Sequence, residues 1–121
     1  MRYLFCGSRT LDGSWTIWNA LQRIVANEGL DNTIVHGGAR GADETAGYYA
    51  ERFGLKVEVH MADWGTHGKA AGPIRNKKML DSGVDAVYAF TTGTLAESKG
   101  TANMVAQATK AGVPTSVKEF A

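Results

Sequence analysis

Residues 36–43, HGGARGAD, place three glycines, an arginine and an aspartate directly after an apolar run. Glycines let backbone N–H groups curl toward an anion, and the N-terminus of a following helix adds partial positive charge. The pattern favours an anion-binding loop, and the alternative is a tight turn without a ligand. The residues expected to contact the anion are Gly37, Gly38, Ala39 and Gly41.

Asp43 falls in the first turn of the expected helix, where it could bond a ribose or an amine. An acid at this position also suits the helix dipole without any ligand. His36, at the end of the expected strand, is either a core or loop-orienting residue or a catalytic group. The candidates for acid–base chemistry are His36, Asp43 and His67, although spacing alone assigns no catalytic residue.

Two further stretches offer groups suited to phosphate. Gly7 ends the first apolar run, Ser8 supplies a hydroxyl, and Arg9 supplies a planar fork of donors. A second stretch stands at the start of a later helix, where backbone amides and a cation would meet an anion. Its residues are Lys99, Gly100 and Thr101.

Arg75 and Asn76 fall in the first turns of a helix expected to begin at Pro73. A cation at a helix N-terminus is unfavourable by roughly 0.3–1 kcal/mol, so Arg75 there implies a nearby anion. The preceding loop contributes Trp64 and His67. Trp64 either stacks on a base or packs the loop onto the sheet.

Composition bounds the class of protein. The chain has 121 residues, which predicts one domain over 1–121, and its net charge of +1 provides no global field for nucleic acid or anionic membrane. The single cysteine suits a reducing compartment, and no apolar run approaches the ~20 residues of a membrane span. We expect a cytoplasmic protein. His60, Asp63 and His67 match no standard metal signature, and neither a metal nor a cofactor is expected.

Short apolar runs alternate with helical patterns along the chain. The expected strands are 2–6, 32–36, 56–61, 84–90 and 113–117. The expected helices are 14–28, 42–53, 73–81 and 101–111. This alternation predicts an α/β fold with a mostly parallel sheet of about five strands.

Burial and ligand position follow from that sheet. The runs expected to be buried are 34–36, 56–61 and 84–90. Pro114 cannot donate to a ladder, so the last strand is expected at an edge. Ligands of such sheets bind outside the carboxyl ends of the strands. The loops expected there are 7–13, 37–41, 62–72 and 91–100.

Taken together, four motifs resemble the SLOG superfamily of LOG- and DprA-like Rossmannoid proteins, and within it the YspA, cpYpsA-related branch. They are GSR, HGGARGAD, W..HG..AGPIRN..M and KGTANM. The resemblance covers nearly the whole chain. It implies a Rossmann-like three-layer sandwich that binds nucleotides or nucleotide-derived molecules at these loops.

The LOG enzymes of this superfamily cleave the base from a nucleoside monophosphate and carry the motif PGGxGTxxE. Gly100 and Thr101 match its GT, but residues 96–98 are Ala-Glu-Ser in place of Pro-Gly-Gly. Met104 stands where the acidic residue is expected. The catalytic carboxylate of LOG enzymes is therefore missing at that position.

Three functions follow from the residues and the resemblance. The first is a binding protein for a nucleotide or nucleotide-derived small molecule, as sensor, sequestering or processing protein. The second is a hydrolase, such as an N-glycosidase or phosphoribohydrolase, acting on a nucleotide-derived substrate. The third is a single-stranded DNA-binding accessory protein, which the near-neutral charge and the lack of a basic–aromatic stripe argue against. Trp15 and Trp18 leave a homo-oligomer as an option.

Overall fold

Five short strands form one parallel sheet in the computed structural model, which describes residues 1–120. They are β1 (Arg2–Gly7), β2 (Thr33–His36), β3 (Lys56–Val59), β4 (Ala86–Thr92) and β5 (Thr115–Phe120). Their order is β3-β2-β1-β4-β5, and every neighbouring pair is parallel. The chain places β2 and β3 on one side of β1, and then β4 and β5 on the other side. The direction of strand order therefore reverses between β1 and β4, and this position is the switch point of the sheet.

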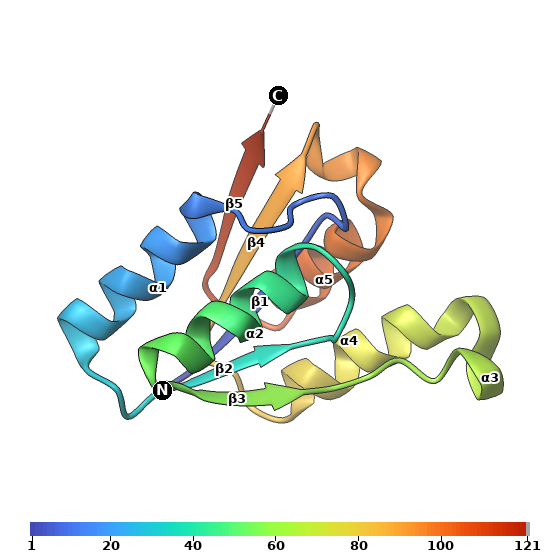
Figure 1. Cartoon of the computed structure of the whole chain (residues 1–121). Coiled ribbons are helices and arrows are strands. Elements are labelled where there is room, and N and C mark those ends of the chain that lie inside the picture. The colour runs from blue at the N-terminus through green and yellow to red at the C-terminus, as the bar shows by residue number, and fades with distance from the viewer. Residues whose placement is uncertain (121) are drawn as a thin grey trace.

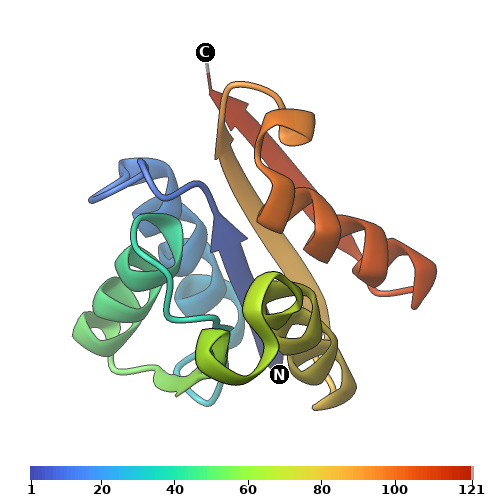
Figure 2. The ribbon, with the colours of Figure 1, turned by 90° about the vertical axis from the view of Figure 1, so that its right-hand side faces the viewer.

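Helices cover both faces of the sheet and give three layers (Figures 1 and 2). The larger ones are α1 (Trp15–Glu28), α2 (Ala42–Phe53), α4 (Ala71–Asp81) and α5 (Lys99–Lys110). Successive strand residues point to opposite faces. Phe5 accordingly belongs to the core under α1 and α2, and Leu4 to the core under α4 and α5. The expected α/β Rossmann-like sandwich is confirmed.

Three short helices stand at the ends of the longer elements. They are α3 (Trp64–His67), the 3-10 helix η1 (Gly68–Ala70) and the 3-10 helix η2 (Leu95–Glu97). None of them contains a buried residue. α3 and η1 lead directly into α4, which begins at Ala71 and not at Pro73 as the sequence predicts.

The expectation that residues 56–61 are buried is wrong. β3 ends at Val59 and lies at the edge of the sheet, where Val59 is 48% and Met61 71% exposed. The last strand lies at the opposite edge, as predicted, but it begins at Thr115 and extends to Phe120. Pro114 stands just before it, where a missing N–H removes no ladder bond.

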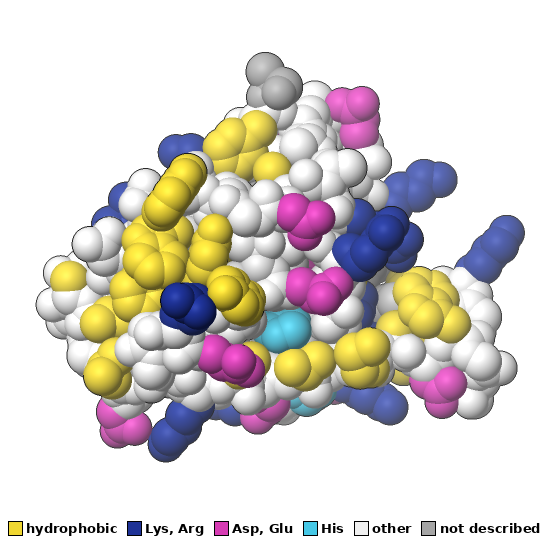
Figure 3. Space-filling model, in the orientation of Figure 1, with side chains coloured by type: hydrophobic (Ala, Val, Ile, Leu, Met, Phe, Trp, Pro, Cys, Tyr) yellow, Lys and Arg dark blue, Asp and Glu magenta, His cyan; other side chains and the backbone are white. Residues whose placement is uncertain are grey.

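Hydrophobic side chains gather over α1 and α2 (Figure 3). Trp18 packs between the helices, with its ring 4.4 Å from that of Phe53 and 5.0 Å from that of Tyr49. Trp15 and Tyr48 are 71% and 58% exposed. Trp18 thus joins α1 to α2, while Trp15 and Tyr48 remain largely exposed on this face.

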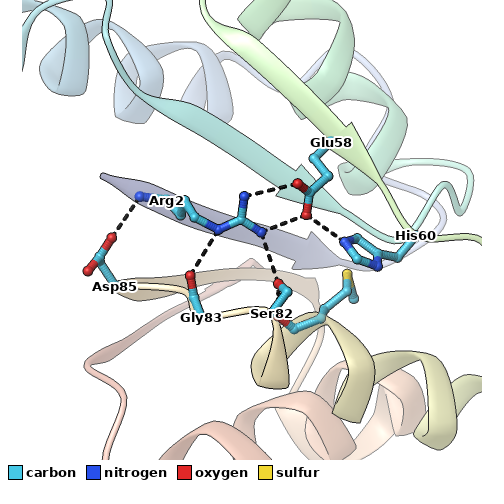
Figure 4. A network of polar contacts seen from close by, with 7 residues as sticks. Arg2, Glu58, His60, Ser82, Gly83 and Asp85 are labelled. Atoms are coloured by element: carbon cyan, nitrogen blue, oxygen red, sulfur yellow. Dashed lines mark hydrogen bonds and ion pairs between the residues drawn. The ribbon is translucent and has the colours of Figure 1, made fainter.

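Arg2 ties the N-terminal end of the sheet together (Figure 4). Its guanidinium donates to both carboxylate oxygens of Glu58, at 2.9 and 2.6 Å, and thereby joins β1 to β3 across β2. It also donates to the Gly83 carbonyl and to the Ser82 hydroxyl, both at 2.9 Å. His60 Nε2 lies 2.6 Å from the same Glu58 carboxylate. Arg2 therefore joins β1 to β3 and to the turn at residues 82–83.

Glu58 should make the stability of the protein sensitive to acid. The hydrogen bond from Arg2, and then the one with His60, lower the pKa of Glu58 from 4.5 to about 2. A lowered folded-state pKa stabilises the protein above pH 4.5, and this contribution is lost as the pH falls toward 2. We expect Glu58→Gln to flatten the fall in urea midpoint across that window. Glu51→Gln is the control, because Glu51 of α2 is exposed and forms no ion pair with a residue of 1–120; matching slopes for the two variants would contradict the assignment.

Candidate ligand-binding site at the switch point

A cavity of about 600 Å³ opens at the carboxyl end of the sheet, where the loops after β1 and β4 separate. α4 and α5, which lie on the same face of the sheet (Figure 2), contribute further lining residues. The volume lies within the range of small-molecule sites. Most of the expected ligand-binding residues line it: Gly7, Ser8, Arg9, Ala39, Asp43, Trp64, Arg75, Asn76, Lys99, Gly100 and Thr101.

The start of α5 presents free backbone amides to the cavity. Ala102 N donates to the Ser98 carbonyl at 2.8 Å and is the first amide with a helical partner. Within residues 1–120, no hydrogen bond uses the amides of Lys99, Gly100 or Thr101. These groups carry the partial positive charge of a helix N-terminus and can bind an oxyanion directly.

Positive side chains around the cavity are not neutralised by the rest of the described chain. The lining cations are Arg9, Lys69, Arg75 and Lys99, and none of them forms an ion pair with a residue of 1–120. Of the two lining acids, Glu97 is occupied by the amide and hydroxyl of Thr94, at 3.0 and 2.9 Å. Figure 3 shows lysine and arginine side chains gathered beside the loops after β1 and β2. The cavity therefore favours an anionic ligand.

Asp43 is the buried acid of the site, with 4% of its surface exposed. Its Oδ2 accepts hydrogen bonds from Gly37 N at 2.9 Å and Ala39 N at 3.4 Å. Burial raises the pKa of Asp43 to about 6, although these two bonds and the nearby Arg75 oppose the shift. A carboxyl with this pKa can exchange a proton near neutral pH.

The glycine loop does not offer the amides of residues 37–39 to an anion, which corrects the expectation from the sequence for these residues. Gly37 N and Ala39 N are occupied by Asp43, and Gly38 N donates to His36 Nδ1 at 3.0 Å. Gly37 and Gly38 do not line the cavity. The amides of Gly37 and Ala39 instead orient the Asp43 carboxylate, and the Gly38 amide is occupied by His36.

Gly41 also has a structural role within the protein, and it lies outside the cavity lining. Its φ is +81°, and a Cβ atom there would lie 2.3 Å from the Ser8 carbonyl oxygen. That oxygen accepts the Ala42 amide at 3.1 Å and so caps α2 from within the protein. The Ala42 amide at the N-terminus of α2 is therefore occupied within the protein, whereas within residues 1–120 the first three amides of α5 are not.

The two histidines proposed as catalytic groups lie away from the cavity lining. His36 is buried, its Nδ1 accepts the Gly38 amide, and its ring lies against Gly47 of α2. Burial, with a smaller effect from Arg75, lowers the pKa of His36, so the ring is neutral and orients the loop. His67 is exposed on α3. Asp43 is the member of the three candidates that reaches the cavity.

Arg75 occupies the second turn of α4, so the helix-terminus argument for a nearby anion does not hold. Its Nη1 donates to the Gly37 carbonyl at 2.6 Å and its Nε to Asn76 Oδ1 at 3.0 Å. Asn76 is buried and donates to the Gly100 carbonyl at 3.3 Å and to Asn103 Oδ1 at 3.1 Å. Asn76 thus connects Arg75 to the first turn of α5.

Several lining residues were missed by the reasoning from sequence. Ser98 Oγ lies 3.0 Å from Ser8 Oγ, which also accepts the Thr92 amide at 3.0 Å. Ser98 is the N-cap residue of α5, which begins at Lys99 and not at residue 101 as expected, and a serine before a helix is the signal that could have identified it. The other lining residues outside the predicted set are Cys6, Thr10, Lys69, Gly72, Pro73, Met79, Thr92, Glu97, Asn103 and Met104. Trp64 is 53% exposed and contributes to the outer rim, over Gly72.

The described residues also bear on membrane and metal sites. Across residues 1–120, no helix is long and apolar enough to cross a membrane. The same residues contain no cluster of three or more histidine, cysteine, aspartate or glutamate side chains that could hold a metal ion. Burial raises the pKa of the Cys6 thiol, which keeps it protonated.

Comparisons with known proteins agree with the motifs. The family model of the YspA, cpYpsA-related SLOG family matches residues 1–67, which contain the loops after β1 and β2. The Gene 61 protein of Mycobacterium phage D29 is 41% identical over 118 residues, covering 93% of this chain and 92% of that protein. No solved structure matches. On the family match and this relative, the chain belongs to the YspA, cpYpsA-related SLOG family.

Proposed function

We propose that the protein binds a nucleotide or nucleotide-derived small molecule in the switch-point cavity, as a sensor, sequestering or processing protein. The observation that carries the proposal is the free N-terminus of α5 beside four lining cations without carboxylate partners. Amides and cations in this arrangement suit the oxygens of a phosphate. Membership of the SLOG family supports the same ligand class.

The remaining walls suit the rest of a nucleotide. Trp64 at the rim offers an aromatic face on which a base could stack. Ser8 and Asn76 lie inside, but their polar groups already bind other residues, so they shape the cavity more than they read the ligand. The phosphate would lie at Lys99, Gly100 and Thr101.

A hydrolase is the second candidate, because Asp43 is a cavity carboxyl whose pKa is raised to about 6. α5 contains no acidic residue, and Met104 is buried in the core at the position of the LOG carboxylate. Base cleavage by the LOG route therefore lacks its carboxylate. We rank binding above hydrolysis for this reason.

One experiment tests binding and cleavage together. We expect native mass spectrometry with the common ribonucleoside 5′-monophosphates to show an adduct of intact nucleotide, and chromatography to detect no free base. Lys99→Glu should lower the adduct at least tenfold, because it reverses the charge at the α5 N-terminus. Lys110→Glu, at the exposed other end of α5, is the control.

Two outcomes would count against this ranking. The absence of any nucleotide adduct, including one carried through purification, would contradict the binding proposal. Steady release of base that Asp43→Ala abolishes would place hydrolysis above binding.

A further inference from the structure

The two carboxylate oxygens of Asp43 have different surroundings. Oδ2 accepts the amides of Gly37 and Ala39, whereas no hydrogen bond within residues 1–120 uses Oδ1. Asp43 lines the cavity, and the described chain contains no fully buried side-chain oxygen without a partner. Oδ1 is therefore the small exposed part of a side chain that is otherwise buried, and it opens to the cavity. It is an acceptor without a donor.

Arg75 lies near the Asp43 carboxyl group and carries a donor of its own that is free within residues 1–120. A Cβ atom at Gly37 would lie 2.4 Å from Arg75 Nη1 and 2.9 Å from Asp43 Oδ2, so both groups flank the same point. Only a glycine at 37 leaves room for them. Nη1 and Nε of Arg75 are occupied, but no hydrogen bond within residues 1–120 uses Nη2. No ion pair joins Arg75 to Asp43.

An adjacent acceptor and donor select among ligand groups by the hydrogen bonds that each group can make. A phosphate oxygen would pair with Arg75 but would be repelled by the Asp43 carboxylate. An amino group would donate to Asp43 but would leave Arg75 unpaired. A hydroxyl group donates to one and accepts from the other, and it satisfies both groups with a single oxygen atom.

We propose that Asp43 is a specificity-determining residue that, together with Arg75, binds a free hydroxyl of the ligand's sugar while the phosphate lies at the α5 N-terminus. The ligand class is then a phosphate ester of a sugar with unblocked hydroxyls, such as a ribonucleotide. This inference rests on the proposed function. It adds that Asp43 and Arg75 recognise the sugar of the ligand.

The test compares ribonucleoside 5′-monophosphates with their 2′,3′-dideoxy analogues by calorimetric titration. Wild-type protein should prefer the ribonucleotide by about ten- to a hundredfold, as expected for a hydrogen bond to a charged group. In Asp43→Asn, the amide oxygen can still accept from Gly37 and Ala39. The NH₂ group then faces the cavity and replaces the charged acceptor with a neutral donor, so the preference should fall by about tenfold.

The outcomes separate this inference from the proposed function. Equal affinity of wild type for the two nucleotide series would overturn the role of Asp43 and leave nucleotide binding intact. An undiminished preference in Asp43→Asn would also overturn it. Failure of both series to bind wild type would overturn the proposed function itself. The comparison on the unaltered protein needs no variant, so a variant that fails to fold does not remove the test.

Discussion

Arg75→Ala is expected to weaken nucleotide binding by about ten- to a hundredfold. The guanidinium lines the cavity, has no carboxylate partner within residues 1–120, and keeps Nη2 free. A partly desolvated hydrogen bond from a charged donor contributes about 1.5–3 kcal/mol, which corresponds to that loss of affinity. Calorimetric titration with a ribonucleoside 5′-monophosphate measures it.

The same variant should also lose a little stability in the absence of ligand. Removing Arg75 deprives the Gly37 carbonyl of its donor, which costs about 1 kcal/mol. The position of Arg75 inside α4, beyond its N-terminus, removes the dipole penalty that would have predicted a gain. Lys78→Ala is the control, because Lys78 of the same helix is exposed and forms no ion pair within residues 1–120. Unchanged affinity together with a large loss of stability would show that Arg75 stabilises the loop after β2 and does not contact the ligand.

The elements near β1 were predictable because local chemistry marks their ends. The run before Gly7 became β1, and the helical stripe up to Phe53 became α2, which ends at Gly54 in the left-handed conformation. Alternating strands and helices then imply a parallel sheet, and a parallel sheet places its loops at one edge. The position of the cavity follows from topology, so it could be inferred without any side-chain geometry.

The burial of β3 could not be predicted, because it depends on strand order. KVEV has the same alternation whether it lies in the centre of a sheet or at its edge. The order β3-β2-β1-β4-β5 leaves β3 with one neighbour, so Val59 remains exposed. Strand order arises from contacts between distant segments, such as the one between Arg2 and Glu58, and a local pattern carries no record of them.

The role of the glycine loop was hidden for a related reason. A glycine beside a ligand and a glycine beside another part of the chain look the same in sequence. Gly37 leaves room for Arg75 and Asp43, which come from distant or later positions. Two of the amides that the pattern assigns to an anion, those of Gly37 and Ala39, are instead satisfied by Asp43, whose negative charge is part of the same motif. The Asp43 carboxylate is thus the anion that the loop binds.

Gly41→Ala is expected to destabilise the protein by about 2–6 kcal/mol, a large part of the ~5–15 kcal/mol typical of a folded domain. Two costs add at this position. A side chain at a φ of +81° costs about 1–3 kcal/mol in backbone strain. A Cβ atom 2.3 Å from the Ser8 carbonyl oxygen and 2.5 Å from that of Arg9 must push two backbone segments apart, which costs roughly as much again.

Gly29→Ala separates these two costs, because Gly29 also has a φ of +81° but no atom lies within 4 Å of a Cβ placed there. It should lose only the strain energy of about 1–3 kcal/mol, measured as the shift of the urea midpoint at unchanged m-value. The excess loss in Gly41→Ala then reports the contact between the loops after β1 and β2. Equal losses would mean that these loops separate at no cost. If the excess is present, Gly41→Ala should also lose nucleotide affinity where it still folds, because the displaced loops carry Arg9 and Asp43 into the cavity wall.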